Sequence, residues 1–162
     1  MVATPLGTTD RYVAPETTKT YLVDSIANIQ SPTRPELDAG TDATAEIATA
    51  TGWATAAANV AVPDGGTLFT SNIPGRVTPE DATIAFYASS DTNDIRDVLA
   101  RGDQTHIVIL HGGDVAGQKM DVWPVRVRSV SKPIDYAGSG ASMINIQFSN
   151  ISEPAEDVLI PA

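Results

Sequence analysis

The chain has 162 residues, contains no cysteine, and carries 20 acidic against 10 basic residues, for a formal net charge of −10. The lack of cysteine excludes disulfides, thiolate metal sites and a cysteine nucleophile, and the acidic balance excludes binding nucleic acid through clustered Lys and Arg. No apolar run approaches the roughly 20 residues that cross a bilayer, so we expect no membrane insertion. The first residues lack the basic and apolar stretches of a secretory signal, so we expect cytosolic synthesis.

This length favours a single domain over residues 1–162. Residues 1–18 are rich in Thr and Pro and have no periodicity, which predicts an extended N-terminal arm. Such an arm is either a floppy tail or a segment that becomes ordered on a neighbouring molecule. In the second case Tyr12 and Val13 are its expected contact residues.

The next segment predicts a strand and a short helix. Residues 20–29 alternate imperfectly between apolar and polar side chains and are read as the first strand. Thr33 and Glu36 have the spacing of a capping box, in which each side chain binds the other residue's backbone N–H. One short helical turn is therefore expected over residues 34–39.

Residues 42–62 are long and rich in Ala and Thr. The helix propensity of Ala favours a helix, whereas the Thr residues and a weak alternation favour strands. We favour strands that bend at Gly52–Trp53, because a glycine inside a strand pattern typically marks a bulge or kink. The small side chains indicate that another sheet or subunit approaches closely.

Residues 63–79 contain three Pro and three Gly and are predicted to be a long loop or an extended hairpin tip. Loops of this length in a compact domain are usually functional or disordered. Leu68, Phe69 and Ile73 favour the functional alternative, since exposed apolar groups usually mark a contact site. Together with Arg76, they are the expected contact residues of this segment.

Residues 83–113 are the one stretch in which the hydrophobic period changes clearly, from the two-residue period of a strand to the period of a helix and back to a strand. The helix is expected at about residues 92–101, because Ile95, Val98 and Leu99 form one apolar stripe at i, i+3 and i+4. The apolar strand after it would be covered on both faces.

The ends of this helix are also suggested by the sequence. Asp91 or Thr92 can accept hydrogen bonds from its first N–H groups, and Asp94 adds negative charge near its positive end. Gly102 has the position of the residue that follows a helix.

Two more strands are expected, over residues 119–130 and 141–150. Arg126 and Arg128 lie on one face of the first of these strands. They either pair with acids of the same chain, remain solvated, or pair with acids of a neighbouring molecule.

The predicted fold is mainly β with one flanking α-helix. It is an antiparallel β-sandwich or small barrel whose core spans residues 19–150. Residues 151–162, with two prolines, are read as a C-terminal arm.

The sequence shows no pattern for catalysis, and we expect no catalytic residue, metal or cofactor. His106 and His111 have an odd spacing, so a regular strand would point them to opposite faces and prevent a shared metal. Asp38, Asp42 and Glu46 do not have the spacing of a calcium-binding loop.

The stretch FTSNIPGRVTPEDATIAFYASSDTNDIRDVLARGDQTHIVILHGG at residues 69–113 resembles the major tail protein, or tail tube protein, of long-tailed (siphovirus-type) bacteriophages, especially those of actinobacterial hosts. In it, IPGRVT at 73–78 leads into a strand, an acid-capped helix follows, and a second strand ends at His111. The resemblance covers residues 20–150. Other matching segments are residues 21–42, the Gly52–Trp53 pair and VWPVRV at 122–127.

This resemblance implies a β-sandwich or barrel of the tail-tube type, with a flanking helix. It implies hexameric rings stacked into a hollow tube, with sheets joined between subunits around a lumen and the long loop and arms contacting neighbouring subunits and rings. The tube would deliver double-stranded DNA to the host without binding it specifically.

The implied partners are other copies of this chain, a tape-measure protein, a tail terminator and distal tail or baseplate proteins. The location would be the virion tail, after synthesis in the bacterial cytoplasm. Acidic residues lining the lumen would oppose sticking of DNA, since like charges repel over about a Debye length, ~8 Å.

Three alternatives stay open. One is a tail terminator or connector protein, and another is an inner-tube subunit of a contractile injection system. The third is a ligand-binding β-sandwich module, which scattered aromatic residues such as Trp53, Tyr87, Trp123 and Tyr136 do not favour. A hydrolase is the least supported class.

Overall fold

The computed structural model describes residues 3–91 and 93–162, which form two compact units. Strand β8 (Lys119–Ser131) contributes its residues up to Trp123 to one unit and the rest to the other. The expectation of a single domain stays a prediction. Unit 1 comprises residues 1–45, 105–123 and 154–162, and unit 2 comprises residues 46–104 and 124–153.

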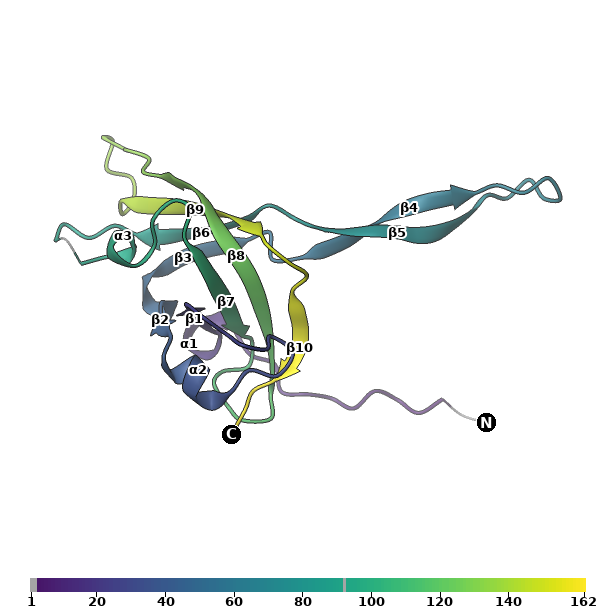
Figure 1. The fold of residues 1–162 in the computed structure, drawn as a ribbon, viewed down its shortest axis with the longest axis horizontal. Coiled ribbons are helices and arrows are strands. Elements are labelled where there is room, and N and C mark those ends of the chain that lie inside the picture. Colours follow the sequence, from purple (N-terminus) through teal and green to yellow (C-terminus); the bar gives the residue numbers. More distant parts are fainter. Residues whose placement is uncertain (1–2, 92) are drawn as a thin grey trace. The chain divides into compact units, whose positions relative to one another are not determined.

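Unit 1 is an antiparallel sheet with the short helix α2 and the turn-like segment α1, in which Pro15 and Glu16 have non-helical backbone angles (Figure 1). Its strands follow the order β2-β1-β7-β8, and β10 also pairs with β8. The bounds are α1 Ala14–Thr17, β1 Lys19–Val23, α2 Arg34–Asp38, β2 Thr41–Asp42, β7 Gln104–Leu110 and β10 Ala155–Leu159.

The core of unit 1 forms where alternate residues of these strands meet α2. Leu37 of α2 is buried against Val23 of β1, Leu110 of β7 and Met120 of β8. Burying one such side chain contributes about 1.5–3 kcal/mol. The predicted capping box is confirmed: the Glu36 carboxylate accepts from the Thr33 N–H and hydroxyl at 2.7 and 2.8 Å.

Unit 2 contains the order β8-β9-β6-β3, in which β6 pairs antiparallel with β3 and β9. One face of this sheet is buried, with Ile84, Phe86, Ile144 and Phe148 at most 1 % exposed. The bounds are β3 Ile47–Thr51, β6 Ala82–Tyr87, α3 Ile95–Val98 and β9 Met143–Asn150, and the 3-10 turn η1 Thr44–Glu46 begins in unit 1 and ends at the first residue of unit 2.

A long hairpin forms a separate two-stranded sheet in unit 2: β4 (Thr55–Val62) and β5 (Ser71–Pro79), drawn as the extended ribbon in Figure 1. Gly52 begins the bend between β3 and β4 with φ +79°, and a Cβ there would lie 2.0 Å from the Asp81 carbonyl oxygen. The structure therefore has the strands bent at Gly52–Trp53 that the sequence indicates.

Of the two alternatives for residues 63–79, the extended hairpin is confirmed and the long loop is wrong for the second half, because residues 71–79 are strand β5 paired with β4. Its prolines and glycine are compatible with pairing, since Pro74 and Gly75 lie where the register with β4 shifts and Pro79 ends the strand. The hairpin turn is confined to residues 63–70.

The helix expected at about 92–101 is also shorter, because α3 spans only Ile95–Val98. Its N-cap is Asp94, not Asp91, and Thr92 lies outside the described residues. The helix ends because Leu99 is buried in extended backbone and the Gly102 N–H, at φ +99°, donates to Val127 of β8.

The two arms differ from each other. Residues 151–162 are not a free arm, because β10 pairs with β8 and buries Val158 and Ile160. Residues 3–13 are extended and exposed, as expected, and α1 follows them. The first strand, predicted over 20–29, stops at Val23.

The fold is therefore mainly antiparallel β with a few short helices, as the sequence indicates. The single flanking helix is replaced by the short segments α1, α2 and α3.

Candidate assembly interface

The hairpin β4–β5 buries none of its residues within the chain. Its apolar side chains are exposed: Leu68 is fully exposed, Phe69 is 77 % exposed and Ile73 is 53 % exposed. An isolated two-stranded ribbon is marginally stable in water at best. A long hairpin with uncovered apolar groups on it therefore calls for a partner that covers it.

The hairpin is poor in charge as well as exposed. Residues 47–79 contain only Asp64 and Arg76 as charged side chains, in a chain whose net charge is −10. Copies of an acidic chain repel one another over a Debye length, about 8 Å at physiological salt. A neutral surface is where two copies can approach with the least repulsion.

Four of the six expected contact residues share this hairpin. Leu68 and Phe69 lie in its turn, and Ile73 and Arg76 lie on β5, all of them exposed. Tyr12 and Val13 lie in the extended segment of unit 1 and are 54 % and 73 % exposed. Their exposure suits contact residues, and contact itself stays a prediction.

Sequence reasoning missed three exposed valines of the hairpin: Val60, Val62 and Val77. Val60 lies opposite Ile73 in the register, so the two share a face of the ribbon. The alternation Asn59-Val60-Ala61-Val62 was a usable signal, because it has the period of a strand.

The free strand edges of unit 2 extend this surface. β3 ends the sheet order and contains neither charge nor proline. Such an edge is a template for pairing with another chain. On the hairpin, β4 has no proline, whereas β5 carries Pro74 and Pro79, which have no N–H to donate.

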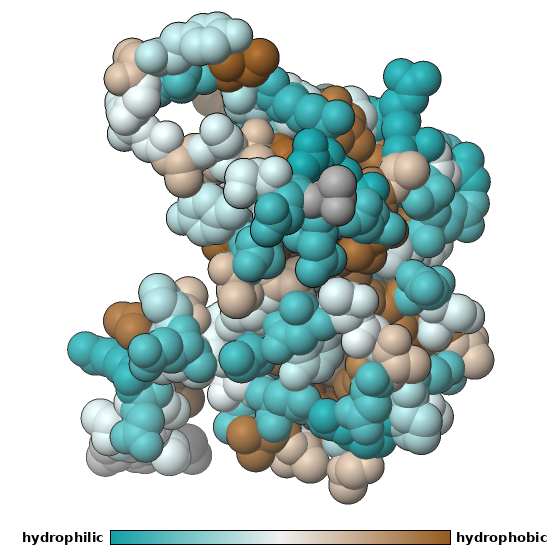
Figure 2. All heavy atoms as spheres, turned by 90° about the vertical axis from the view of Figure 1, so that its left-hand side faces the viewer, coloured by the Kyte–Doolittle hydropathy of each residue, from teal (hydrophilic) through white to brown (hydrophobic). Residues whose placement is uncertain are grey.

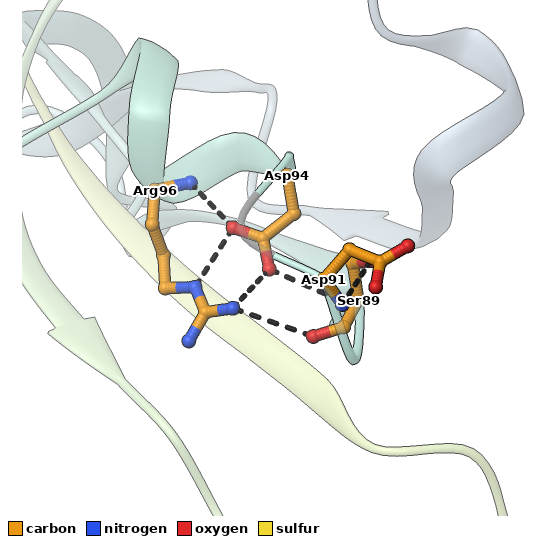
Figure 3. Close-up of polar contacts among 4 residues, drawn as sticks. All are labelled: Ser89, Asp91, Asp94 and Arg96. Atoms are coloured by element: carbon orange, nitrogen blue, oxygen red, sulfur yellow. Dashed lines mark hydrogen bonds and ion pairs between the residues drawn. The ribbon is translucent and has the colours of Figure 1, made fainter.

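A polar network orders the loop before α3 (Figure 3). The Asp94 carboxylate accepts from the Ser89 N–H, the Arg96 N–H and the Arg96 guanidinium, whose Nη2 lies 2.6 Å away. These hydrogen bonds, above all those from the Arg96 side chain, hold the pKa of Asp94 far below its usual value. Figure 2 shows mostly hydrophilic side chains on the face of the molecule that contains this loop.

Unit 1 contains a second network beside a cavity of about 190 Å³. Arg34 donates to Asp114 at 2.6 and 2.7 Å and to Asp38 at 2.8 Å, and the Tyr21 hydroxyl donates to Asp114 at 2.9 Å. Burial, and then the bond to Asp114, raise the pKa of Tyr21 to about 12. Because Arg34 already serves two carboxylates, the cavity offers a ligand no uncommitted cation.

The histidines do not form a metal site. His106 Nδ1 lies 3.2 Å from the Val23 carbonyl oxygen, and His111 Nε2 lies 2.6 Å from an Asp121 oxygen. Within residues 3–91 and 93–162, no group of three or more His, Asp or Glu is placed to hold a metal ion. No helix in the described part of the chain has the length and apolar character needed to span a membrane.

The sheet fold leaves the hairpin uncovered within the chain, so the exposed hairpin is the feature that a partner would cover. A family model described as phage tail tube protein matches residues 7–162. The chain therefore belongs to the phage tail tube protein family, and it is a structural protein of the phage tail.

Solved structures agree with this fold. The chain is similar to a protein in the baseplate of the anti-feeding prophage, with a TM-score of 0.55, 8 % identity, and coverage of 94 % of this chain and 95 % of that chain. It is also similar to a protein in the tube-terminating cap of the same particle, with a TM-score of 0.59, 13 % identity, and coverage of 93 % and 95 %. No curated protein matches.

Proposed function

We propose that this chain forms hexameric rings that stack into the hollow tail tube of a long-tailed phage, and that double-stranded DNA passes through this tube into the host. The observation that carries the proposal is the hairpin β4–β5, which is long, exposed and nearly uncharged. Membership of the tail tube family supports the tube. Six-fold closure and an actinobacterial host rest on the sequence resemblance.

Two kinds of contact would build this tube. Within a ring, the free edge of β3 in one copy would pair with a strand of the next copy, which removes an exposed edge. Between rings, the hairpin and the segment 3–13 would lie on the neighbouring ring and cover Leu68, Phe69, Ile73, Tyr12 and Val13. Arg76, the only basic residue of the hairpin, would pair with one of the many acids of the neighbour.

The completed tail would add other partners. A tape-measure protein would occupy the growing tube, a terminator would close one end, and distal tail or baseplate proteins would start the other. These partners are the ones that the resemblance to the tail tube family implies.

A second candidate is a terminating ring or an inner-tube subunit of a contractile injection system. The structural matches to a tube-terminating cap and to a baseplate favour it. A terminator would form one ring and would not stack.

Negative-stain electron microscopy of the purified protein, with its mass in solution, tests the proposal. Hollow tubes or stacked rings are expected. Single rings that never stack would support the terminator. A monomer at every concentration, with or without purified tail partners, would contradict both.

A matched pair of variants tests the hairpin itself. Ile73 and Val115 are both β-branched and both 53 % exposed, but only Ile73 lies on the hairpin. We expect Ile73→Asp to abolish stacking and Val115→Asp to leave it intact, with unchanged thermal unfolding of both monomers. Equal assembly of the two variants would contradict the role of the hairpin.

A further inference from the structure

The acidic residues of unit 2 are absent from its main sheet. The strands β3, β6, β9 and the unit-2 part of β8 lie entirely within the described residues, and none of them contains an Asp or Glu. The acids of this unit lie instead in its loops, its short helical segments and the hairpin turn. Although the chain has 20 acidic residues, the strands of this sheet therefore carry no negative charge.

The register shows which side chains share the open face of this sheet. Thr83 lies opposite Thr51 on β3 and opposite Gln147 on β9, and Gln147 lies opposite Ser129 on β8. The Ser129 hydroxyl donates to the Gln147 side-chain oxygen at 2.9 Å, which places both on the same side. A second row is formed by Thr49, Ala85, Asn145 and Ser131.

The charges at this open face come from two arginines and from the Asp81 carboxylate that pairs with one of them. Arg128 is paired with Asp81, from the turn before β6, at 2.9 Å and also donates to Gln147 at 3.2 Å. Arg126 is exposed, between the buried Val125 and Val127, so it points to the open side. The face therefore carries mainly hydroxyl and amide groups, together with Ala85, Tyr87 and Met143, and Arg126 is its one arginine without the Asp81 partner.

We propose that this open face is the wall that double-stranded DNA passes, and that its strands present hydroxyl and amide groups to the lumen and no carboxylate of their own. The proposal rests on the function proposed above. In a ring of sheets joined edge to edge, one face of each sheet must point to the lumen. The other face is filled by the chain's own core, including Phe86, Ile146 and Phe148, so only the open face is available.

Such a wall would keep DNA from sticking without the charge repulsion that carboxylates would provide. Sticking to the phosphates requires clustered cations that release counterions, and this face has only Arg126 in addition to the paired Arg128. Hydroxyl and amide groups keep water bound, and water can lie between the wall and the phosphates. The acids in the loops supply the net charge that keeps free subunits apart.

The chain contains no cysteine, so single cysteines can report on this face. We choose Thr49→Cys on β3 and Asn145→Cys on β9, both on the open face. Each variant is treated with a small maleimide and with a polyethylene-glycol maleimide too bulky for the lumen, as free subunit and as assembled tube. In tubes, we expect the small reagent to react at both sites and the bulky reagent to lose most of its reactivity.

The outcomes separate this inference from the proposed function. If tubes form but the bulky reagent labels both cysteines as fast as in free subunits, the face is on the outside and the inference fails alone. If neither reagent reacts, the face is buried between copies and the inference also fails. If no tubes or rings form under any condition, the proposed function fails with it.

A charge substitution then tests the passage of DNA. Asn145→Lys is expected to slow DNA ejection, and each phosphate contact the lysine makes should weaken about three- to fourfold between 50 and 200 mM salt. The near-isosteric Asn145→Asp removes the amide but adds no cation, so it should not slow ejection. Normal ejection by Asn145→Lys phages with intact tails would overturn the proposal.

Discussion

The backbone angle φ of Gly52 determines the bend between strand β3 and the hairpin β4–β5. This φ of +79° lies in the left-handed region, which costs an L side chain about 1–2 kcal/mol. The Asp81 carbonyl oxygen also fills the place of a Cβ, at 2.0 Å. This bend lets the chain leave the main sheet after β3, form the hairpin β4–β5, and return to the sheet as β6.

We expect Gly52→Ala to lower the free energy of unfolding by clearly more than the ~1–2 kcal/mol of a left-handed residue alone, because the clash adds to the strain. Gly102→Ala is the matched control, since its φ is +99° but no atom lies within 4 Å of its Cβ position. Denaturant unfolding of the two variants gives the difference. Equal losses would show that the close approach to Asp81 is relaxed at no cost.

The network of Tyr21, Arg34 and Asp114 makes a prediction about pH. Folding raises the pKa of Tyr21 from 10.0 to about 12, so the unfolded chain ionises first. The contribution of Tyr21 to stability is therefore fully present below pH 10 and is lost between pH 10 and about 12. The free-energy difference between wild type and Tyr21→Phe should shrink over that window, and a constant difference would contradict it.

The same network also makes stability depend on pH in acid, through the Asp114 carboxyl, whose pKa is lowered. Hydrogen bonds from Arg34 hold the pKa of Asp114 below 3.8, so its stabilisation is present above that pH and is lost as the pH falls through the lowered pKa. The difference between wild type and Asp114→Asn should accordingly disappear only in strong acid.

The hairpin and the N-terminal segment differ from the other elements because neither of them contains a buried residue in the described structure. Their residues are exposed in the described structure, whereas β10, which the sequence also suggested was an arm, is paired with β8. Composition alone could not separate these cases. Pro-rich ends look alike in sequence, and only pairing with a distant strand distinguishes them.

Deleting residues 1–13 should leave the monomer folded, because α1 and β1 remain and no residue of the described part of the segment is buried. We expect no tubes from this variant, since its exposed apolar anchors Tyr12 and Val13 are removed. Thermal unfolding and electron microscopy check the two halves of the prediction. Wild-type tubes from the deletion variant would exclude the segment from assembly.

At the scale of the whole molecule, the net charge of −10 opposes assembly, while the hairpin, whose two charges Asp64 and Arg76 cancel, favours it. Raising the ionic strength from 10 to 150 mM shortens the Debye length from about 30 to 8 Å. We therefore expect the concentration needed for assembly to fall with added salt, measured by sedimentation of tubes. A rise would instead indicate that contacts between copies depend on ion pairs.

The sequence by itself determined what depends on neighbouring residues. The period of two gives the strands, Thr33 and Glu36 give the capped turn, Gly52 gives the bend, and Leu68, Phe69 and Ile73 identify the exposed segment. Only the tertiary structure decided that residues 71–79 pair with β4, that α3 stops at Val98, and that the strands of the unit-2 sheet, none of which contains Asp or Glu, have one open face. Those features depend on strands far apart in the chain, and local patterns carry no record of which strand pairs with which.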